Sequence, residues 1–141
     1  MSEDEVNILE EGNRLNLDFS KLLKISRTVN DVIPVAVQDN KSKEIILIAY
    51  TNEIAFNHTI KTKIVTFWSS SRNELWIKGN TSGNTFSIKK IFVNCEQNSL
   101  VYVVEANQGG ICHTSNRTGK PRNCYYRSLN LETLELENID P

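Results

Sequence analysis

The apolar residues of the chain gather into short runs that are separated by polar turns, and this pattern predicts a protein rich in β-strands. Two apolar runs, at 33–37 and 45–50, flank the polar stretch Asp39-Asn40-Lys41-Ser42-Lys43. Strand-like runs on either side of such a stretch are typical of a β-hairpin. Four more strands are predicted downstream, at 64–68, 75–78, 85–95 and 99–105.

Two short helices are also predicted. The first covers 18–26, and the second begins after a polar cap at Thr51 or Asn52 and ends at about Lys61. The chain lacks the repeated alternation of strand and helix that builds a doubly wound parallel sheet. We therefore expect an α+β, β-rich single domain. The side chains of the second helix that we expect to face inward are Ile54, Ala55 and Ile60.

The length and the charge of the chain refine this expectation. At 141 residues the chain has room for one ordinary domain. Nine of its 17 acidic residues lie in the first 12 and the last 12 positions, which hold no Lys or Arg, so the remainder carries 16 basic and eight acidic residues. We expect a loosely held acidic arm at 1–17, a folded domain at 18–129 and an acidic tail at 130–141. The basic excess would attract an anionic ligand, and a solvated basic surface explains it equally well.

Neither membrane insertion nor export is predicted. The longest apolar runs, at 45–50 and 100–104, are far shorter than the roughly 20 residues that a transmembrane helix needs. The chain opens with Met-Ser-Glu-Asp-Glu rather than with the basic and apolar segments of an export signal. A cytoplasmic location is therefore expected.

Three cysteines, Cys95, Cys112 and Cys124, are the first candidates for chemistry. An odd number of cysteines without an export signal argues against a disulfide framework. A buried structural thiol suits Cys95, which follows an apolar run, but Cys112 and Cys124 lie in a polar, glycine-containing stretch. Three thiolates with an open fourth position form a catalytic zinc arrangement, and His113 stands beside Cys112. The cysteine spacing favours metal binding and leaves structural thiols as the alternative.

Several motifs, in this order along the chain, resemble the phosphoribosyl-AMP cyclohydrolase family of histidine biosynthesis, whose members open the adenine ring of their substrate. The resemblance spans about 32–128, almost the whole predicted domain. Such a set of motifs in one order is hard to obtain by chance. The motifs are Trp-Ser-x-Ser-Arg at 68–72, Leu-Trp-x-Lys-Gly at 75–79, Val93-Asn94-Cys95, Gly-Gly-Ile-Cys-His-Thr at 109–114 and Cys124-Tyr125-Tyr126-Arg127.

The resemblance implies a β-rich intertwined homodimer with its active sites between the subunits. It also implies a zinc ion bound by three cysteines, one from one chain and two from the other, which here are Cys95, Cys112 and Cys124. Zinc lowers the pKa of a bound water toward 7, so that hydroxide can add to C6 of the adenine ring and the C6–N1 bond can break. His113 is the expected proton carrier, and a fourth zinc ligand is its alternative role. His58, on the second helix, is expected to be structural.

The family's substrate carries two phosphates, and polar residues inside the matching motifs are the candidates to bind it. They offer three cations, four hydroxyl groups and glycines that let the backbone approach a ligand closely. Arg122, between the last two cysteines, is a weaker candidate. Phe67, Trp68 and Trp76 could stack on a base, although strand aromatics are more often part of a core. The candidate substrate-binding residues are Trp68, Ser69, Ser71, Arg72, Lys78, Thr81, Ser82, Gly83 and Arg127.

The chain departs from the family's usual pattern at two places. The usual magnesium-binding motif is Asp-Cys-Asp-x-Asp, whereas this chain has Asn94-Cys95-Glu96-Gln97-Asn98. A hard divalent cation loses most of its charged ligands there, so we expect only weak magnesium binding at Glu96, with Asn94 and Asn98. Eleven residues separate Cys112 from Cys124, about twice the usual number, and a longer loop costs little closure entropy.

Three functions are compatible with these features. The first is zinc-dependent hydrolysis of phosphoribosyl-AMP, a nucleotide, by a homodimer. The alternatives are a zinc hydrolase that acts on another purine or amidine, and a non-catalytic, zinc-stabilised nucleotide-binding protein. A purely structural zinc is normally closed by a fourth ligand, so three cysteines favour an enzyme. Nucleic-acid binding is not expected, because the basic residues are scattered rather than arranged in a stripe with aromatic residues.

Overall fold

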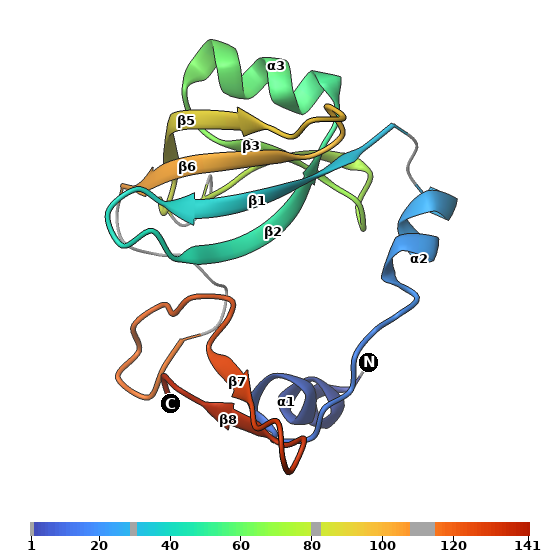
Figure 1. Cartoon of the computed structure of the whole chain (residues 1–141), viewed down its shortest axis with the longest axis vertical. Helices are drawn as coiled ribbons and strands as arrows, with labels where there is room; N and C mark the ends of the chain where they lie inside the picture. The colour runs from blue at the N-terminus through green and yellow to red at the C-terminus, as the bar shows by residue number, and fades with distance from the viewer. Residues whose placement is uncertain (1, 29–30, 80–82, 108–114) are drawn as a thin grey trace.

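The computed structural model describes residues 2–28, 31–79, 83–107 and 115–141 of the chain. Within these ranges a four-stranded sheet is accompanied by two small two-stranded sheets and by helices (Figure 1). In this described part, no helix combines the length and apolar character needed to cross a membrane. The elements are, in order, α1 (Glu3–Glu11), α2 (Lys21–Thr28), β1 (Ile33–Asp39), β2 (Ile45–Thr51), α3 (Glu53–Thr62), β3 (Thr66–Ser69), β4 (Glu74–Ile77), β5 (Phe86–Val93), β6 (Leu100–Ala106), β7 (Arg127–Leu129) and β8 (Leu136–Asn138).

The four-stranded sheet has the order β2-β1-β6-β5. Strand β1 is antiparallel to β2 and parallel to β6, and β6 is antiparallel to β5. The predicted hairpin is β1–β2, and the four strands predicted downstream correspond to β3 to β6, so both predictions are confirmed. A parallel pair requires a long crossover, and here the crossover from β1 to β6 contains β2, α3 and β3 to β5.

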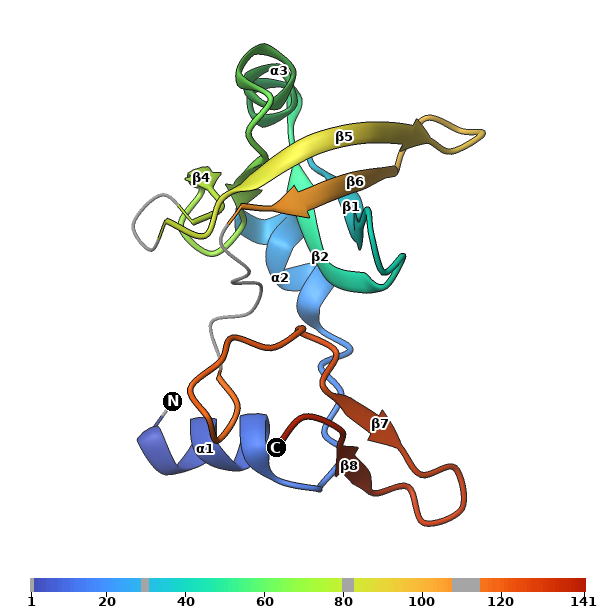
Figure 2. The same cartoon turned by 90° about the vertical axis from the view of Figure 1, so that its left-hand side faces the viewer.

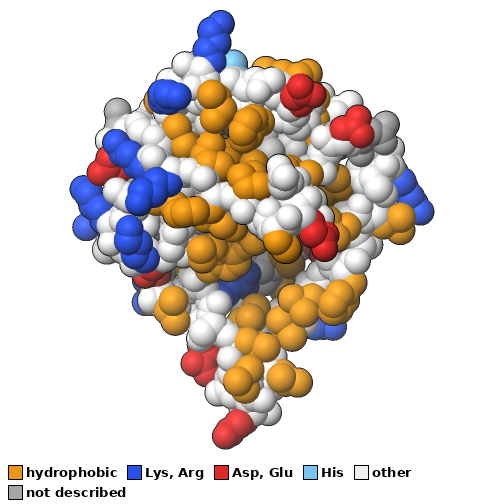
Figure 3. Space-filling model, turned by 45° about the horizontal axis from the view of Figure 1, so that its top comes forward, with side chains coloured by type: hydrophobic (Ala, Val, Ile, Leu, Met, Phe, Trp, Pro, Cys, Tyr) orange, Lys and Arg blue, Asp and Glu red, His pale blue; other side chains and the backbone are white. Residues whose placement is uncertain are grey.

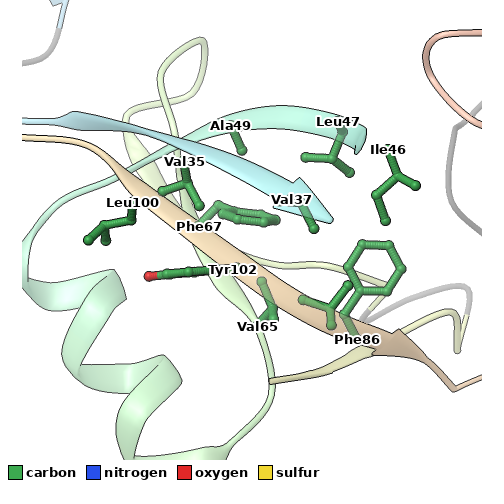
Figure 4. Packing of buried hydrophobic residues seen from close by; sticks show 11 residues of the cluster. Val35, Val37, Ile46, Leu47, Ala49, Val65, Phe67, Phe86, Leu100 and Tyr102 are labelled. Carbon is green, nitrogen blue, oxygen red and sulfur yellow. The ribbon is translucent and has the colours of Figure 1, made fainter. Parts of the chain in front are cut away.

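The hydrophobic core lies on one face of this sheet (Figure 4). Val35 and Val37 of β1 are fully buried on that face, in keeping with the two-residue period of a strand. The ring of Phe67 stacks on Tyr102 of β6 with a centroid distance of 6.2 Å and lies 5.6 Å from the ring of Trp76. The core position expected for Phe67 is therefore confirmed.

Helix α3 packs against β3 through small side chains rather than through its isoleucines. Ala55 and Thr59 are fully buried, whereas Ile54 is 59% exposed and Ile60 is 41% exposed. The prediction that both isoleucines face inward is wrong, and only Ala55 does so. The reason is a hydrogen bond that fixes the helix face: the Thr66 N–H donates to the Thr59 hydroxyl at 2.9 Å. The predicted cap at Asn52 is confirmed, because its side chain accepts from the Ala55 N–H at 3.0 Å.

The N-terminal segment, which we expected to be loosely held, contains helix α1. Ser2 caps this helix, and three acidic residues in its first turn favour the positive end of the helix dipole. The chain after α1 joins the end of the molecule, because the Leu136 N–H donates to the Asn13 carbonyl at 2.7 Å and Arg14 forms a β-bridge with Glu135. Strands β7 and β8 and helix α1 therefore lie together, below the central sheet in Figures 1 and 2. The acidic tail at 130–141 includes β8, which the sequence did not predict.

Candidate functional site

Cys95 lies exposed in the turn between β5 and β6, and amide side chains close this turn. The Asn94 side-chain oxygen accepts from the N–H groups of Asn98 (2.9 Å) and Ser99 (3.0 Å). The Asn94 side-chain nitrogen donates to the Asn98 oxygen at 2.6 Å, and the Asn98 nitrogen donates to the Glu96 carboxylate at 3.2 Å. Two ionised carboxylates at 94 and 98 could not donate to one another, so amides let this turn close without a cation.

Cys124 lies exposed in the segment that leads into β7. Its backbone N–H donates to the Ile46 carbonyl of β2 at 3.2 Å. Partial burial raises the pKa of the adjacent Tyr125 hydroxyl, and the Cys124 thiol next to it raises that pKa further. Cys112 and His113, the other candidates in this part of the chain, lie outside the described residues.

Cys95 and Cys124 of one chain lie at opposite edges of the central sheet. Cys95 follows β5 at one edge, whereas Cys124 is hydrogen-bonded to β2 at the other. Three strand spacings of about 4.8 Å each separate β5 from β2 by about 14 Å. Two thiolates on one zinc ion, each about 2.3 Å from it, lie within about 5 Å of each other. These two cysteines of one chain therefore cannot bind the same zinc ion in this arrangement.

Among the residues that the structure describes, no three His, Cys, Asp or Glu side chains gather closely enough to hold a metal ion. His58 contributes to no such group. Its Nδ1 is hydrogen-bonded to the Thr66 hydroxyl at 2.9 Å, so it links α3 to β3. This contact supports the structural role that the sequence predicts for His58.

The turn between β3 and β4 gathers four of the predicted substrate-binding residues. The Ser69 hydroxyl lies 3.3 Å from the Ser71 hydroxyl and accepts from the Arg72 N–H at 3.3 Å. The Arg72 guanidinium pairs with Glu74 at 3.4 Å in an exposed position. Trp68 is half-buried and donates from its indole nitrogen to Asn73 at 3.1 Å. Two hydroxyls and a guanidinium on one exposed turn are suited to a phosphate group.

The chain after β4 carries a buried lysine and a turn that requires glycine. Lys78 is 9% exposed, with its ammonium 5.0 Å from the centre of the Phe86 ring. Gly79 has a φ of +80°, and a Cβ there would lie 2.1 Å from the carbonyl carbon of Asn84. The Gly83 N–H donates to the Gly79 carbonyl at 2.7 Å. The candidates Thr81 and Ser82, between these glycines, lie outside the described residues.

Two arginines that the sequence offers as phosphate ligands instead contact α1. Arg127 donates to the carbonyls of Leu9 (2.8 Å) and Gly12 (3.0 Å) at the C-terminal end of that helix. Arg122 is 2% exposed and pairs with Glu11. Within one chain, the structure does not bring either arginine to the turn between β3 and β4. The signal that sequence reasoning missed was the opposite charge of two segments: α1 is acidic, whereas the segment that carries Arg122 and Arg127 is basic.

A pocket of about 300 Å³ opens between the start of α3 and the turn that carries Cys95. Gln97 of that turn lines it, together with Thr51, Asn52 and Phe56 at the other side. Next to Thr51 is Tyr102, whose fully buried hydroxyl has no hydrogen bond of good geometry within the described ranges. Burial raises the pKa of Tyr102, and the Thr51 and Thr59 hydroxyls oppose that rise. The sequence did not predict this pocket, because its residues come from three separate stretches of the chain, 31–33, 51–56 and 93–100.

Comparison with known proteins identifies a family for this arrangement. The family model described as phosphoribosyl-AMP cyclohydrolase matches residues 47–126. Relatives that bear the name phosphoribosyl-AMP cyclohydrolase match most of this chain, and three of them serve as examples. The protein from Cenarchaeum symbiosum is 46% identical over 113 residues, which are 80% of this chain and 93% of the relative. The protein from Methanosarcina acetivorans is 40% identical over 112 residues (79% and 88%), and that from Archaeoglobus fulgidus is 44% identical over 98 residues (70% and 85%).

Proposed function

The chain belongs to the phosphoribosyl-AMP cyclohydrolase family, and we therefore propose that it is the enzyme that opens the adenine ring of phosphoribosyl-AMP in histidine biosynthesis. The match over 47–126 carries this proposal, because it includes all three cysteines and His113. In the reaction the oxygen of water bonds to C6 of the adenine ring, the C6–N1 bond breaks, and a proton ends on N1. Atoms balance with water alone, and no oxidant or reductant is needed.

A zinc ion fits the donors that the chain offers. Cys95 and Cys124 are exposed thiols, and thiolates prefer zinc to magnesium because they are soft ligands. We propose that Cys95, Cys112 and Cys124 hold this ion. Bound there, zinc would supply a water made nucleophilic at neutral pH.

We further propose that each zinc site is shared between two chains, with Cys95 from one and Cys112 and Cys124 from the other. The distance across the sheet between β5 and β2 supports this arrangement, since one chain cannot bring Cys95 and Cys124 to one ion. Sharing a site in this way requires a homodimer.

The outer face of the central sheet supports dimerisation. The strand register aligns Ile48, Ala36, Val101 and Phe92 in one row across the four strands, on the face away from the core. Ile48 and Phe92 are each 54% exposed. Figure 3 shows that apolar side chains form a broad patch on this side of the molecule. A large exposed apolar patch is typical of an interaction surface.

The residues that act on protons and phosphates follow from the same proposal. His113 would carry the proton to N1, because histidine is the side chain whose ordinary pKa, near 6.5, lies closest to neutral pH. The Nδ1 of His58 is instead engaged with the Thr66 hydroxyl, in keeping with a structural role for this side chain. Ser69, Ser71 and Arg72 would bind one substrate phosphate on the turn between β3 and β4. Arg127 can take part only if the partner chain brings it there.

Magnesium plays a smaller role in this proposal. The side chains of Asn94 and Asn98 are engaged with each other and with the turn backbone, which leaves Glu96 as the charged oxygen ligand. We propose that magnesium binds weakly, or only together with substrate phosphates.

Incubation of the purified, zinc-loaded protein with phosphoribosyl-AMP tests the activity. We expect a product one water heavier, detected by mass spectrometry and by the change in adenine absorbance. The Cys112→Ser variant is the matched control and should form none. Binding of the nucleotide without product would support a non-catalytic binding protein, and neither binding nor product would favour a hydrolase with another substrate.

A further inference from the structure

The pocket between α3 and the Cys95 turn is lined by apolar side chains and by two carboxylates. Ile33, Val93 and Leu100 supply apolar surface, and Phe56 adds an aromatic side chain to the lining. Asp31 and Glu53 supply the two carboxylates. No Lys or Arg is among the described residues that line it. A phosphate is therefore a poor ligand for this pocket, and a flat cation is a good one.

The proposed substrate contains such a cation. Its adenine ring carries a ribosyl group on N1, and alkylation at N1 leaves the ring positively charged at neutral pH. The adenine of AMP, which is unsubstituted at N1, is neutral under the same conditions. An aromatic face and nearby carboxylates stabilise a planar cation more than a neutral ring of the same shape.

We propose that this pocket binds the N1-substituted adenine ring and that Glu53, Asp31 and Phe56 select it by its positive charge. The assignment rests on the proposed function and adds to it the site that distinguishes the substrate from AMP. The two phosphates then lie outside the pocket, because its described lining holds no Lys or Arg to bind them.

The position of the pocket agrees with the chemistry that the ring must undergo. Gln97 lines the pocket and lies two residues after Cys95 in the same turn. A ring held there lies against the turn that carries the thiol proposed to hold zinc. Asn52 fixes the start of α3 through its cap, and this cap places Glu53 and Phe56 on the first turn of the helix.

Binding of two nucleotides to the zinc-loaded protein tests this assignment without turnover. The probes are 1-methyladenosine 5′-monophosphate, which is cationic, and AMP, which is neutral in the ring. Calorimetry gives the ratio of their dissociation constants for the wild type, for the Asp31→Asn plus Glu53→Gln double variant and for Phe56→Leu. Glu44→Gln, an exposed carboxylate in the turn between β1 and β2, is the matched control.

We expect the wild type and Glu44→Gln to prefer the cationic nucleotide, and the double variant to lose about three- to tenfold of that preference. Phe56→Leu should lose part of it. An unchanged preference in both variants, or an equal loss of affinity for both nucleotides, would overturn the assignment. Conversion of phosphoribosyl-AMP by the same protein would still uphold the proposed function. Wild-type protein that neither binds the cationic nucleotide nor converts phosphoribosyl-AMP would overturn both.

Discussion

The guanidinium of Arg122 lies 3.7 Å from the centre of the Tyr126 ring and is ion-paired with Glu11 of α1. The Arg122 side chain is 1% exposed, and it also donates to the Asp140 carbonyl at 3.2 Å. The Tyr126 hydroxyl donates to the Glu10 carbonyl at 2.6 Å. Arg122 and Tyr126 lie two residues before and two residues after Cys124, so α1 holds in place the segment that carries this thiol.

Removal of Glu11 should therefore loosen the Cys124 segment. We expect Glu11→Ala to lower the free energy of unfolding by about 1–3 kcal/mol, because it leaves the buried Arg122 charge without its carboxylate. Urea unfolding measures this change, and Glu132→Ala, at an exposed acidic position, is the control. Zinc should also leave the Glu11→Ala protein faster than the wild type when a chelator is added. Equal stability of the two variants would show that α1 does not hold this segment.

Zinc content tests the proposed ligands directly. We expect about one zinc per chain in the wild type and a large loss in Cys95→Ser, Cys112→Ser and Cys124→Ser, because a serine hydroxyl is a poor replacement for a thiolate. Elemental analysis of the purified proteins gives the ratio. Full zinc retention in Cys112→Ser or Cys124→Ser would rule out this ligand set.

Subunit mixing tests whether the site is shared. A heterodimer of Cys95→Ser and Cys124→Ser chains has one site with all three cysteines and one site with two of them replaced. Random exchange of equal amounts makes half of the dimers mixed, so about a quarter of the wild-type activity should return. Mass spectrometry of the intact dimers shows whether exchange has taken place. Exchange without recovered activity would contradict the shared site.

Local sequence patterns predicted the central sheet well but the contacts between distant segments poorly. The hairpin β1–β2 and the strands β3 to β6 follow from alternation and turn residues, which act over a few positions. Ile54 and Ile60 were misplaced because a tertiary hydrogen bond, between Thr59 and Thr66, sets the face of α3. Helix α1 and strand β8 were missed because that region is stabilised by contacts between residues more than 100 positions apart in the sequence, such as Arg122 and Glu11.

The candidate site was predicted in its chemistry more than in its arrangement. Residue types and motif order pointed to zinc, a nucleotide and a proton carrier. They gave no indication that Arg127 contacts α1, because α1 lies outside every motif and more than 100 positions away from Arg127 along the chain. The pocket beside Gln97 depends on the packing of α3 against the sheet, which periodicity does not encode.

The two histidines should differ in what their removal changes. His113→Ala should lower the turnover rate by about 10²–10⁴-fold and keep its zinc, because a positioned acid–base group contributes about that much. His58→Ala should keep most of the activity and lose about 0.5–1.5 kcal/mol of stability through the missing bond to Thr66. Kinetics and zinc analysis on the same samples separate the two effects. Loss of zinc in His113→Ala would instead make His113 a ligand.

The last prediction concerns the amides in the Cys95 turn. In the Asn94→Asp plus Asn98→Asp variant, the 2.6 Å hydrogen bond between the two side chains is lost and two negative charges face each other. Without a cation the turn should therefore be less stable than in the wild type. Magnesium would relieve the repulsion, since hard cations prefer charged oxygen ligands, and Glu96 adds a third carboxylate. We expect this variant to bind magnesium more tightly than the wild type while it keeps its zinc.

Calorimetric titration with magnesium, and thermal unfolding with and without it, measure both effects. Asn57→Asp, at an exposed position on α3, controls for the added charge and should respond to magnesium as the wild type does. Because the wild-type amides already satisfy one another, magnesium should change the wild-type melting temperature little. Tight magnesium binding by the wild-type protein without substrate would falsify the weak-binding proposal. Turnover that requires added magnesium at saturating zinc would instead place the second cation with the substrate phosphates, where its charge is balanced by the ligand rather than by this turn.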